Sequence, residues 1–487
     1  MLKIKITDID KNALALKEIK YIFETLCLTI GTPWHFVPAH FTGPVDVYYG
    51  LNETVSARLY IKANPESVLK SKKAPRVFQE SGITFMDFSD QPVAASYTTT
   101  SDNQVVLKND IVYSLFYLIA GKSEADIPRN KLDQHDVFQS VLYKNNLLHT
   151  PVFNQYAELI AELFADVYEF APRWKDGKKA ALALSHDTDY PEMIKSIEIL
   201  RYILTNRNKL KFSTIPDILS GKNHFWQFDN FIELEQAYGA KSAFYFCPLK
   251  GSLFRYFFIA PDPFYDTSTT KFKAVFKKLN DIGFETGLHS SYFAYQSLAS
   301  FKKEKEKLQE EAGFEIVGNR HHYWHLNQDD PSETAFIHQE SGLFYDSSLS
   351  FEKHSGFRYS ICTPFNLWHK TQEKALSILQ LPPTLMDDHL FGHARNHSFA
   401  TFKEHIDSLV QSVADYRGVF VADFHARVLN TTFFPQWGEA YQYLLEAIAA
   451  REDFYIDTPI NICKYWQERM THLKNQAKDE VSGVYQR

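Results

Sequence analysis

The chain has 487 residues, of which 45% are hydrophobic and 15% aromatic, so it can form two or three domains with sizeable cores and is not a disordered protein. Its formal net charge is -7, so the chain lacks the excess of basic residues that is typical of nucleic-acid-binding proteins. Its four cysteines have no paired spacing, which argues against a disulfide framework and against a cysteine-based zinc site.

Residues 1–150 are predicted to form a smaller α/β domain of unknown role. A helical pattern covers about residues 11–28, VDVYYG at 45–50 predicts a short strand, and NDIVYSLFYLIAG at 109–121 predicts a helix that ends at a glycine. The first residues, MLKIKITDIDKN, lack the apolar core of a signal peptide, and no stretch is long and apolar enough to cross a bilayer. We therefore expect a cytoplasmic protein without a transmembrane segment, or one loosely bound at the inner membrane surface.

A helix and a linker are predicted over residues 151–179. Thr150 is a good N-cap and Pro151 suits the first helical turn, and the residues that follow are amphipathic. The polar stretch APRWKDGKKA at 171–180 then breaks the helical pattern. At the other end of the chain, residues 471–487 are polar and are expected to form a tail.

Between residues 180 and 470, short apolar runs alternate with longer helical patterns, which predicts parallel strands joined by crossover helices. The runs are AALALS (180–185), SAFYFC (242–247), GFETGL (283–288), FEIVGN (314–319), GLFYDS (342–347), ALSILQL (375–381), VFVADF (419–424) and FYID (454–457). Their number and spacing predict a (β/α) barrel. In such barrels the carboxyl ends of the strands build the active site.

Titratable residues follow one predicted strand after another: Asp187 and Asp189 after the first, His289 after the third, Arg320 and His322 after the fourth, Asp387 beyond the sixth and His425 after the seventh. In SHDTD the two carboxylates point the same way if the chain stays extended, and they repel unless a cation lies beside them. A metal would resolve the conflict, with histidines as the expected further ligands. The alternative is a turn in which both aspartates cap backbone amides.

The segments SHDTD, GLHSSY, GNRHHYW, FYDSSL and VADFHA, in this order, resemble the motif series of the polysaccharide deacetylase family of carbohydrate esterases. The resemblance covers about residues 180–460 and is to a divergent bacterial branch with an extra N-terminal domain. It implies an α/β fold, namely a distorted (β/α) barrel preceded by the smaller N-terminal domain. It also implies one divalent metal, with zinc the expected ion, and an acetylated carbohydrate as substrate.

The resemblance further implies roles for single residues. Asp187 matches the catalytic base, Asp189 and His289 match metal ligands, and His425 matches the general acid. Arg320 matches the arginine that orients the base.

A backbone amide near Tyr323 is implied to help bind the oxyanion. One position departs from the family pattern, because Phe293 stands where the second metal histidine is usual, four residues after the first. His322 replaces a proline of the third motif, and we expect its imidazole to reach the metal instead of the absent histidine. The alternative is that His322 is a pocket residue that contacts substrate.

Three further residues are candidates for substrate binding. Tyr292 and Trp324 flank polar positions, so their rings could stack on a sugar or belong to the barrel core. Asp387 is expected to line the pocket, with a capping role as the alternative. His389, His393 and His397 have the spacing of a helical face, but we expect a solvated or loop role for them.

Together these features predict a metal-dependent deacetylase acting on a sugar of a cell-envelope or exopolysaccharide precursor. Two other functions stay open. One is a non-catalytic carbohydrate-binding or scaffold protein with a degenerate site, which the residue at position 293 favours. The other is a hydrolase of non-peptide C–N bonds in a non-sugar substrate, since a fold by itself does not specify the reaction. The sequence does not indicate the exact glycan or the oligomeric state.

Overall fold

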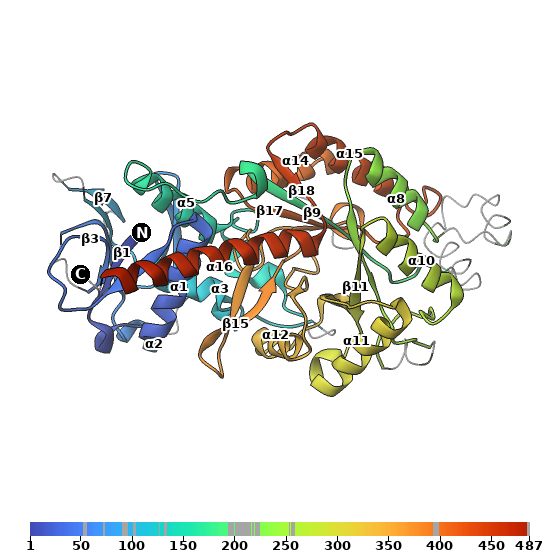
Figure 1. The fold of residues 1–487 in the computed structure, drawn as a ribbon, viewed down its shortest axis with the longest axis horizontal. Helices are drawn as coiled ribbons and strands as arrows, with labels where there is room; N and C mark the ends of the chain where they lie inside the picture. The colour runs from blue at the N-terminus through green and yellow to red at the C-terminus, as the bar shows by residue number, and fades with distance from the viewer. Residues whose placement is uncertain are drawn as a thin grey trace.

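The computed structural model describes the chain except for residues 52–55, 72–73, 90–95, 101–103, 126, 131–133, 193–198, 200–215, 217–218, 220–224, 253, 255–258, 393–398 and 485–487. The molecule is elongated, with a sheet of N-terminal strands at one end and a larger barrel-like sheet at the other (Figure 1). The long C-terminal helix runs across both parts (Figure 1).

The N-terminal part is built on a six-stranded sheet in the order β2-β1-β3-β4-β8-β7, in which only the β7–β8 pair is antiparallel. Its strands are β1 (Leu2–Ile6), β2 (Trp34–Val37), β3 (Val45–Gly50), β4 (Ala57–Lys62), β7 (Tyr97–Thr99) and β8 (Val105–Leu107). A separate antiparallel hairpin is formed by β5 (Arg76–Glu80) and β6 (Ile83–Asp87). The expectation of a smaller α/β region before the barrel is therefore confirmed.

The helices of this part are α1 (Leu16–Ile30), α2 (Ser67–Ser71), α3 (Ile111–Ile119), α4 (Val141–Lys144) and α5 (Val152–Phe164). α1 begins later than the sequence pattern predicts and ends at Gly31, whose φ of 101° favours glycine. Both α3 and α5 pack against α1. The helix expected to connect the two parts therefore packs with the N-terminal helices.

The second sheet has the order β14-β15-β13-β12-β11-β10-β9-β17-β16, and β18 also pairs with β9. Its strands are β9 (Ala180–Asp187), β10 (Ser242–Phe246), β11 (Glu285–Ser290), β12 (Gly318–His321), β13 (Tyr345–Asp346), β14 (Phe365–His369), β15 (Lys374–Gln380), β16 (Leu385–Met386), β17 (Val419–Asp423) and β18 (Phe454–Ile456). All pairs are parallel except β14–β15. β9 is buried along its whole length, as is usual for a central parallel strand.

Strands β9 to β13 lie side by side in chain order, as in a (β/α) barrel, whereas β15 lies between β13 and β14. Within the described residues the hydrogen-bonded path ends at β14 and at β16, so the sheet is open between these two strands. Its helices are α8 (Phe228–Ala237), α10 (Thr270–Asp281), α11 (Leu298–Ala312), α12 (Pro331–Glu340), α13 (Asp388–Phe391), α14 (Phe402–Asp415) and α15 (Trp437–Ala449). The fold is the expected distorted (β/α) barrel.

The last helix, α16 (Pro459–Val484), packs against β9 of the barrel and against β2 of the N-terminal sheet. The guanidinium of Arg469 on α16 donates to the carbonyl oxygens of Leu28 and Pro172. It therefore binds the end of α1, where helical carbonyls lack partners of their own. The helix continues through the stretch expected as a polar tail, and one continuous core of buried apolar side chains extends through both parts.

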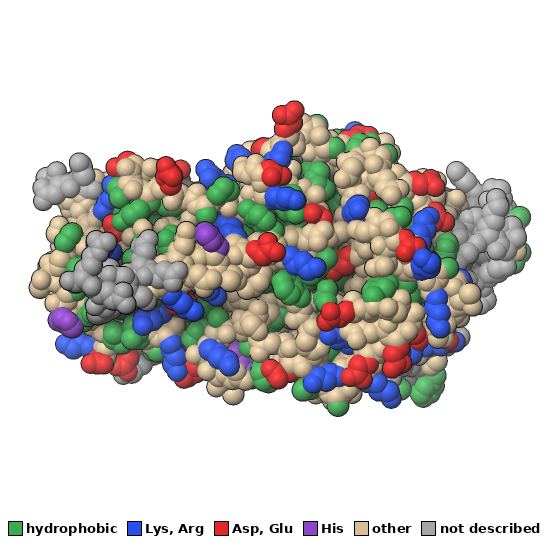
Figure 2. All heavy atoms as spheres, in the orientation of Figure 1, with side chains coloured by type: hydrophobic (Ala, Val, Ile, Leu, Met, Phe, Trp, Pro, Cys, Tyr) green, Lys and Arg blue, Asp and Glu red, His purple; other side chains and the backbone are tan. Residues whose placement is uncertain are grey.

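Among the described residues, no helix has the length and hydrophobicity needed to cross a membrane. Basic and acidic side chains are interspersed over the face drawn in Figure 2, without a large area of one sign. This distribution agrees with the modest net charge of the chain.

Candidate metal centre and active site

The carboxyl ends of the parallel strands bring the titratable residues of the motifs together at one end of the barrel. Asp187 is the last residue of β9, His289 lies next to the end of β11, and Arg320 lies on β12 opposite His289 in the strand register. β12 begins later than the predicted run, so that the polar residues GNRH form the strand and all four are buried. The strand ends thus form a polar, enclosed site.

Asp189, His289 and His322 converge, with one ligand atom of each lying within 4.8 Å of the others. Asp189 Oδ1 is 3.0 Å from His289 Nε2 and 3.5 Å from His322 Nε2. Two ligand atoms bound tetrahedrally to one ion at about 2.1 Å would lie about 3.4 Å apart. The three side chains therefore have the chemistry and the spacing of a site for one divalent cation.

The hydrogen bonds of the two histidines support this interpretation. His289 Nδ1 lies 2.8 Å from the carbonyl oxygen of Arg320, to which it donates, and this leaves the lone pair of Nε2 directed at Asp189. His322 is 1% exposed, and neither of its ring nitrogens has a hydrogen-bond partner among the described residues. A buried imidazole without partners is costly, and a bound cation would satisfy it.

The carboxylate of Asp189 is held in its charged form. Burial acts to raise its pKa, but the neighbouring imidazoles outweigh burial and hold the pKa well below the usual range of an aspartate. His289, despite its burial, has a raised pKa because of the charges of Asp187 and Asp189. The carboxylates of Asp187 and Asp189 therefore place negative charge beside the histidines, and a bound cation could balance it.

Arg320 binds the candidate base. Its guanidinium is fully buried, and Nη1 donates to Asp187 Oδ1 at 3.0 Å. Nη2 donates to the hydroxyl oxygens of Ser185 at 2.7 Å and Ser347 at 3.0 Å, and the guanidinium lies over the ring of Tyr245. The other oxygen of Asp187, Oδ2, lies 3.9 Å from His289 Nε2 and thus faces the metal cluster.

A second carboxylate, Asp423 on β17, shares the same arginine. Its Oδ1 lies 3.0 Å from Arg320 Nη1 and accepts a hydrogen bond from the backbone N–H of Asp187. Burial and the charge of Asp187 raise the pKa of Asp423 to about 8. Burial therefore favours the protonated, neutral form of Asp423 beside Arg320.

His425 also contacts the cluster and is bound by Asp387. The Asp387 carboxylate accepts from His425 Nδ1 at 3.0 Å and from the backbone N–H of His425 at 2.7 Å. His425 Nε2 lies 3.2 Å from Asp189 Oδ2. Although burial opposes it, the two aspartates raise the pKa of His425 well above its usual value. Asp387, expected to line the pocket, is fully buried and contacts His425.

The turn after β12 is strained. Tyr323 and Trp324 have φ values of 57° and 47°, a conformation that costs non-glycine residues about 1–2 kcal/mol each. The carbonyl oxygen of Tyr323 accepts a hydrogen bond of 3.1 Å from the side chain of Gln134, which lies far away in the chain. Strain of this kind persists where the surrounding structure enforces it, often at functional sites.

The aromatic residues next to the site are mostly buried. The ring of Tyr292 stacks on that of His325 at 3.9 Å and lies edge-on to the rings of Phe293 and Tyr323. Tyr292 and Trp324 are each 5% exposed. Only a small edge of either ring is therefore open to a substrate in this conformation.

Other histidines of the motifs point elsewhere. His321 lies 2.8 Å from His338 through their Nε2 atoms, away from the metal cluster. His186 binds the carbonyl oxygen of Phe424 and the carboxylate of Glu235, both at 2.7 Å. The buried imidazole of His389 binds backbone groups, and the other two members of its sequence series, at positions 393 and 397, lie outside the described residues.

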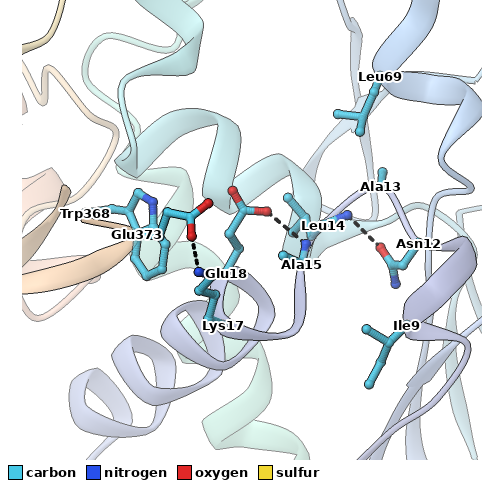
Figure 3. Close-up of a pocket in the computed structure, with 10 residues that line it drawn as sticks. All are labelled: Ile9, Asn12, Ala13, Leu14, Ala15, Lys17, Glu18, Leu69, Trp368 and Glu373. Atoms are coloured by element: carbon cyan, nitrogen blue, oxygen red, sulfur yellow. Dashed lines mark hydrogen bonds and ion pairs between the residues drawn. The ribbon is translucent and has the colours of Figure 1, made fainter. Parts of the chain in front are cut away.

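A cavity of about 370 Å³ lies between the N-terminal part and the β14–β15 hairpin, away from the strand ends (Figure 3). It is lined by Ile9, Asn12, Ala13, Leu14, Ala15, Lys17, Glu18, Leu69, Trp368 and Glu373. Lys17 and Glu373 form an ion pair across it (Figure 3). Since none of these residues belongs to the metal cluster, the cavity is separate from the candidate active site.

Comparison with known proteins gives one family match and several structural neighbours. Residues 9–169 match the model of a family of unknown function, DUF7033. No curated protein matches the chain.

Its structural neighbours include a protein from Mycobacterium smegmatis assigned as a polysaccharide deacetylase, with 16% identity over 61% of this chain and 93% of that one and a TM-score of 0.40. An allantoinase has 14% identity over 62% of this chain and 95% of that one, with a TM-score of 0.41. A polysaccharide deacetylase from Bacillus cereus has 12% identity over 57% and 91%, with a TM-score of 0.29. At these identities and TM-scores, the neighbours do not establish the chemistry of this chain.

Sequence reasoning missed two carboxylates of the site. Asp423 lies two residues before His425 in VADFHA, so the period-two alternation of a strand could have placed it beside the site. Asp262, fully buried near His322, lies in an irregular segment between β10 and α10 and carries no signal in the sequence.

Proposed function

We propose that this protein is a metal-dependent deacetylase that hydrolyses an acetyl group from a sugar of a cell-envelope or exopolysaccharide precursor. One observation carries the proposal. Three groups able to hold a divalent cation lie between an arginine-bound carboxylate and an aspartate-bound histidine, at the carboxyl end of a barrel. The order of the sequence motifs over residues 180–460 supports the carbohydrate substrate and the assignment of residues 180–470 as the catalytic unit.

Asp189, His289 and His322 are the proposed ligands, and three protein ligands are the number typical of catalytic zinc sites. A divalent ion held there supplies Lewis acidity to the acyl carbonyl and makes a water molecule a stronger acid. Phe293, at the usual place of the second metal histidine, cannot contribute a ligand, and His322 takes that role in the proposal.

Asp187 is the proposed general base. Arg320 holds Oδ1, which fixes the carboxylate in one orientation and leaves Oδ2 facing the cluster to take a proton from water. A carboxylate oriented in this way toward the cluster can act as a general base.

His425 is the proposed general acid. Asp387 accepts from Nδ1, so Nε2 is the nitrogen that presents a proton to the leaving nitrogen or oxygen of the sugar. The raised pKa of His425 keeps this proton in place at neutral pH. The backbone amide near Tyr323 is proposed to bind the oxyanion, in the strained turn that follows β12.

The test combines metal analysis with an activity assay. The purified protein is supplied with Zn²⁺ or Co²⁺, its metal content is measured, and acetate release is followed on a panel of N- and O-acetylated sugars. We expect about one metal per chain and acetate release that stops on chelation and returns when metal is added. Asp189→Asn should lower both metal affinity and activity.

Two outcomes would contradict the proposal. A protein that binds neither metal ion would be left as a non-catalytic carbohydrate-binding or scaffold protein. A protein that binds metal but hydrolyses only amides outside the sugar panel would be a hydrolase of a different substrate class.

A further inference from the structure

The two histidines of the metal cluster differ in how their rings are held. His289 donates from Nδ1 to the carbonyl oxygen of Arg320 at 2.8 Å, and this bond fixes both its tautomer and its orientation. His322 has no such bond among the described residues, although it is almost completely buried. It also lies at the start of the strained turn that contains Tyr323. A metal ligand in this position needs a partner for its second nitrogen.

A carboxylate faces that second nitrogen. Asp262 Oδ1 lies 3.7 Å from His322 Nδ1, and the Asp262 side chain is fully buried. The backbone N–H of Tyr292 donates to the same oxygen at 2.8 Å and so fixes its position. The distance to His322 is about 0.5–1 Å longer than a hydrogen bond, which is within the reach of a small rotation of the imidazole ring.

We propose that Asp262 is a positioning residue that accepts the Nδ1 proton of His322 and thereby directs the Nε2 lone pair toward Asp189 and His289. The inference rests on the proposed metal site and deepens it. Carboxylates that bind the outer nitrogen of a ligating histidine fix its tautomer and raise its basicity, and their loss costs about 10–100-fold in metal affinity. Asp262 does for His322 what the backbone carbonyl of Arg320 does for His289.

The proposal also gives the buried carboxylate of Asp262 a facing donor in addition to the backbone N–H of Tyr292. A carboxylate removed from water is costly unless a proton donor or a positive charge faces it. A protonated Nδ1 of a metal-bound His322 is a donor with partial positive charge at the right place. The pair therefore gives the buried Nδ1 of His322 an acceptor for its proton.

The first experiment measures Zn²⁺ affinity of the full-length protein by competition with a chromophoric chelator. We expect Asp262→Ala to weaken Zn²⁺ binding about 10–100-fold. Asp262→Asn keeps the shape of the side chain but removes its charge, and should give an intermediate affinity. Asp266→Asn is the matched control, because Asp266 lies in the same segment and binds Ser268 and Lys250 instead. It should bind Zn²⁺ like the wild type.

The second experiment separates positioning from a general effect on folding. In a His322→Ala background, adding Asp262→Ala should cause no further loss of Zn²⁺ affinity, because Asp262 acts through His322. The visible absorption bands of the Co²⁺-loaded protein should change in Asp262→Asn, while its thermal melting in the absence of metal stays close to that of the wild type.

The outcomes distinguish this inference from the proposed function. If the wild type binds no metal, the proposed function fails and the inference fails with it. If the wild type binds Zn²⁺ and Asp262→Ala binds it equally well, or if the losses of Asp262→Ala and His322→Ala add, only the inference is overturned.

Discussion

Replacing Glu285 with glutamine is expected to change how the stability of the protein depends on pH. Glu285 lies on β11, inside the barrel, and is 7% exposed. Its carboxylate accepts from the hydroxyl of Tyr345 at 2.6 Å and from the backbone N–H of Ile460, near the start of α16, at 2.9 Å. Burial outweighs these bonds and raises the pKa of Glu285 from 4.5 to about 7.

The size and the sign of the effect follow from this shift. Between pH 4.5 and 7 the folded protein holds a proton on Glu285 that the unfolded chain releases, so this group stabilises the folded state fully below pH 4.5. The contribution decreases as the pH rises and is lost above pH 7. A shift of this size corresponds to about 3 kcal/mol. Glutamine resembles the protonated acid and does not titrate.

The assay is urea unfolding of the wild type and of Glu285→Gln between pH 5 and 8. Relative to that of the wild type, the free energy of unfolding of the variant should increase by about 2–3 kcal/mol as the pH rises from 5 to 8, which means that the variant becomes relatively more stable. Glu306→Gln, at an exposed position on α11, is the control and should show no such trend. A difference between Glu285→Gln and wild type that is the same at every pH would refute the reasoning.

Three further outcomes are expected. Asp187→Asn should keep its metal affinity but lose acetate release about 10²–10⁴-fold, and near-full activity would show that the base is another group. His425→Ala should slow the hydrolysis of an acetamide more than that of an activated aryl acetate, and an equal loss on both would contradict its role as an acid. In thermal melting, Glu124→Gln should destabilise the folded protein by about 3–5 kcal/mol, because it removes the charged partner of the buried guanidinium of Arg358. Asp281→Asn breaks an exposed ion pair and should lower the stability by less than about 1 kcal/mol.

The main strands of the barrel could be predicted because their signal is local. β9, β10, β11 and β17 fall on short, largely apolar runs, and a buried parallel strand needs such a run whatever its neighbours are. β14 and β16 were not predicted. β14 is an antiparallel edge strand and β16 has two residues, so both are defined by their hydrogen-bonding partners. β12 begins later than the predicted apolar run, because the residues that form the buried strand are the polar ones of the site.

The residues of the candidate site also divide into those that the sequence predicts and those that only the structure places. Asp187, Asp189, His289 and His425 could be found because each follows an apolar run, and the ends of parallel strands meet at one edge of a sheet. His322 could be nominated because it follows the same kind of run, and the structure brings its Nε2 close to Asp189.

By itself, then, the sequence determined the fold class and the residues that follow the strands, since both depend on apolar and polar alternation over a few neighbours. Only the tertiary structure decided that Asp387 binds His425, that Asp262 faces His322 and that Asp423 shares Arg320 with Asp187. The partners in these contacts are 38 or more residues apart in the chain. No local pattern encodes such a contact, because it exists only after the sheet has folded and water has been removed from between the side chains.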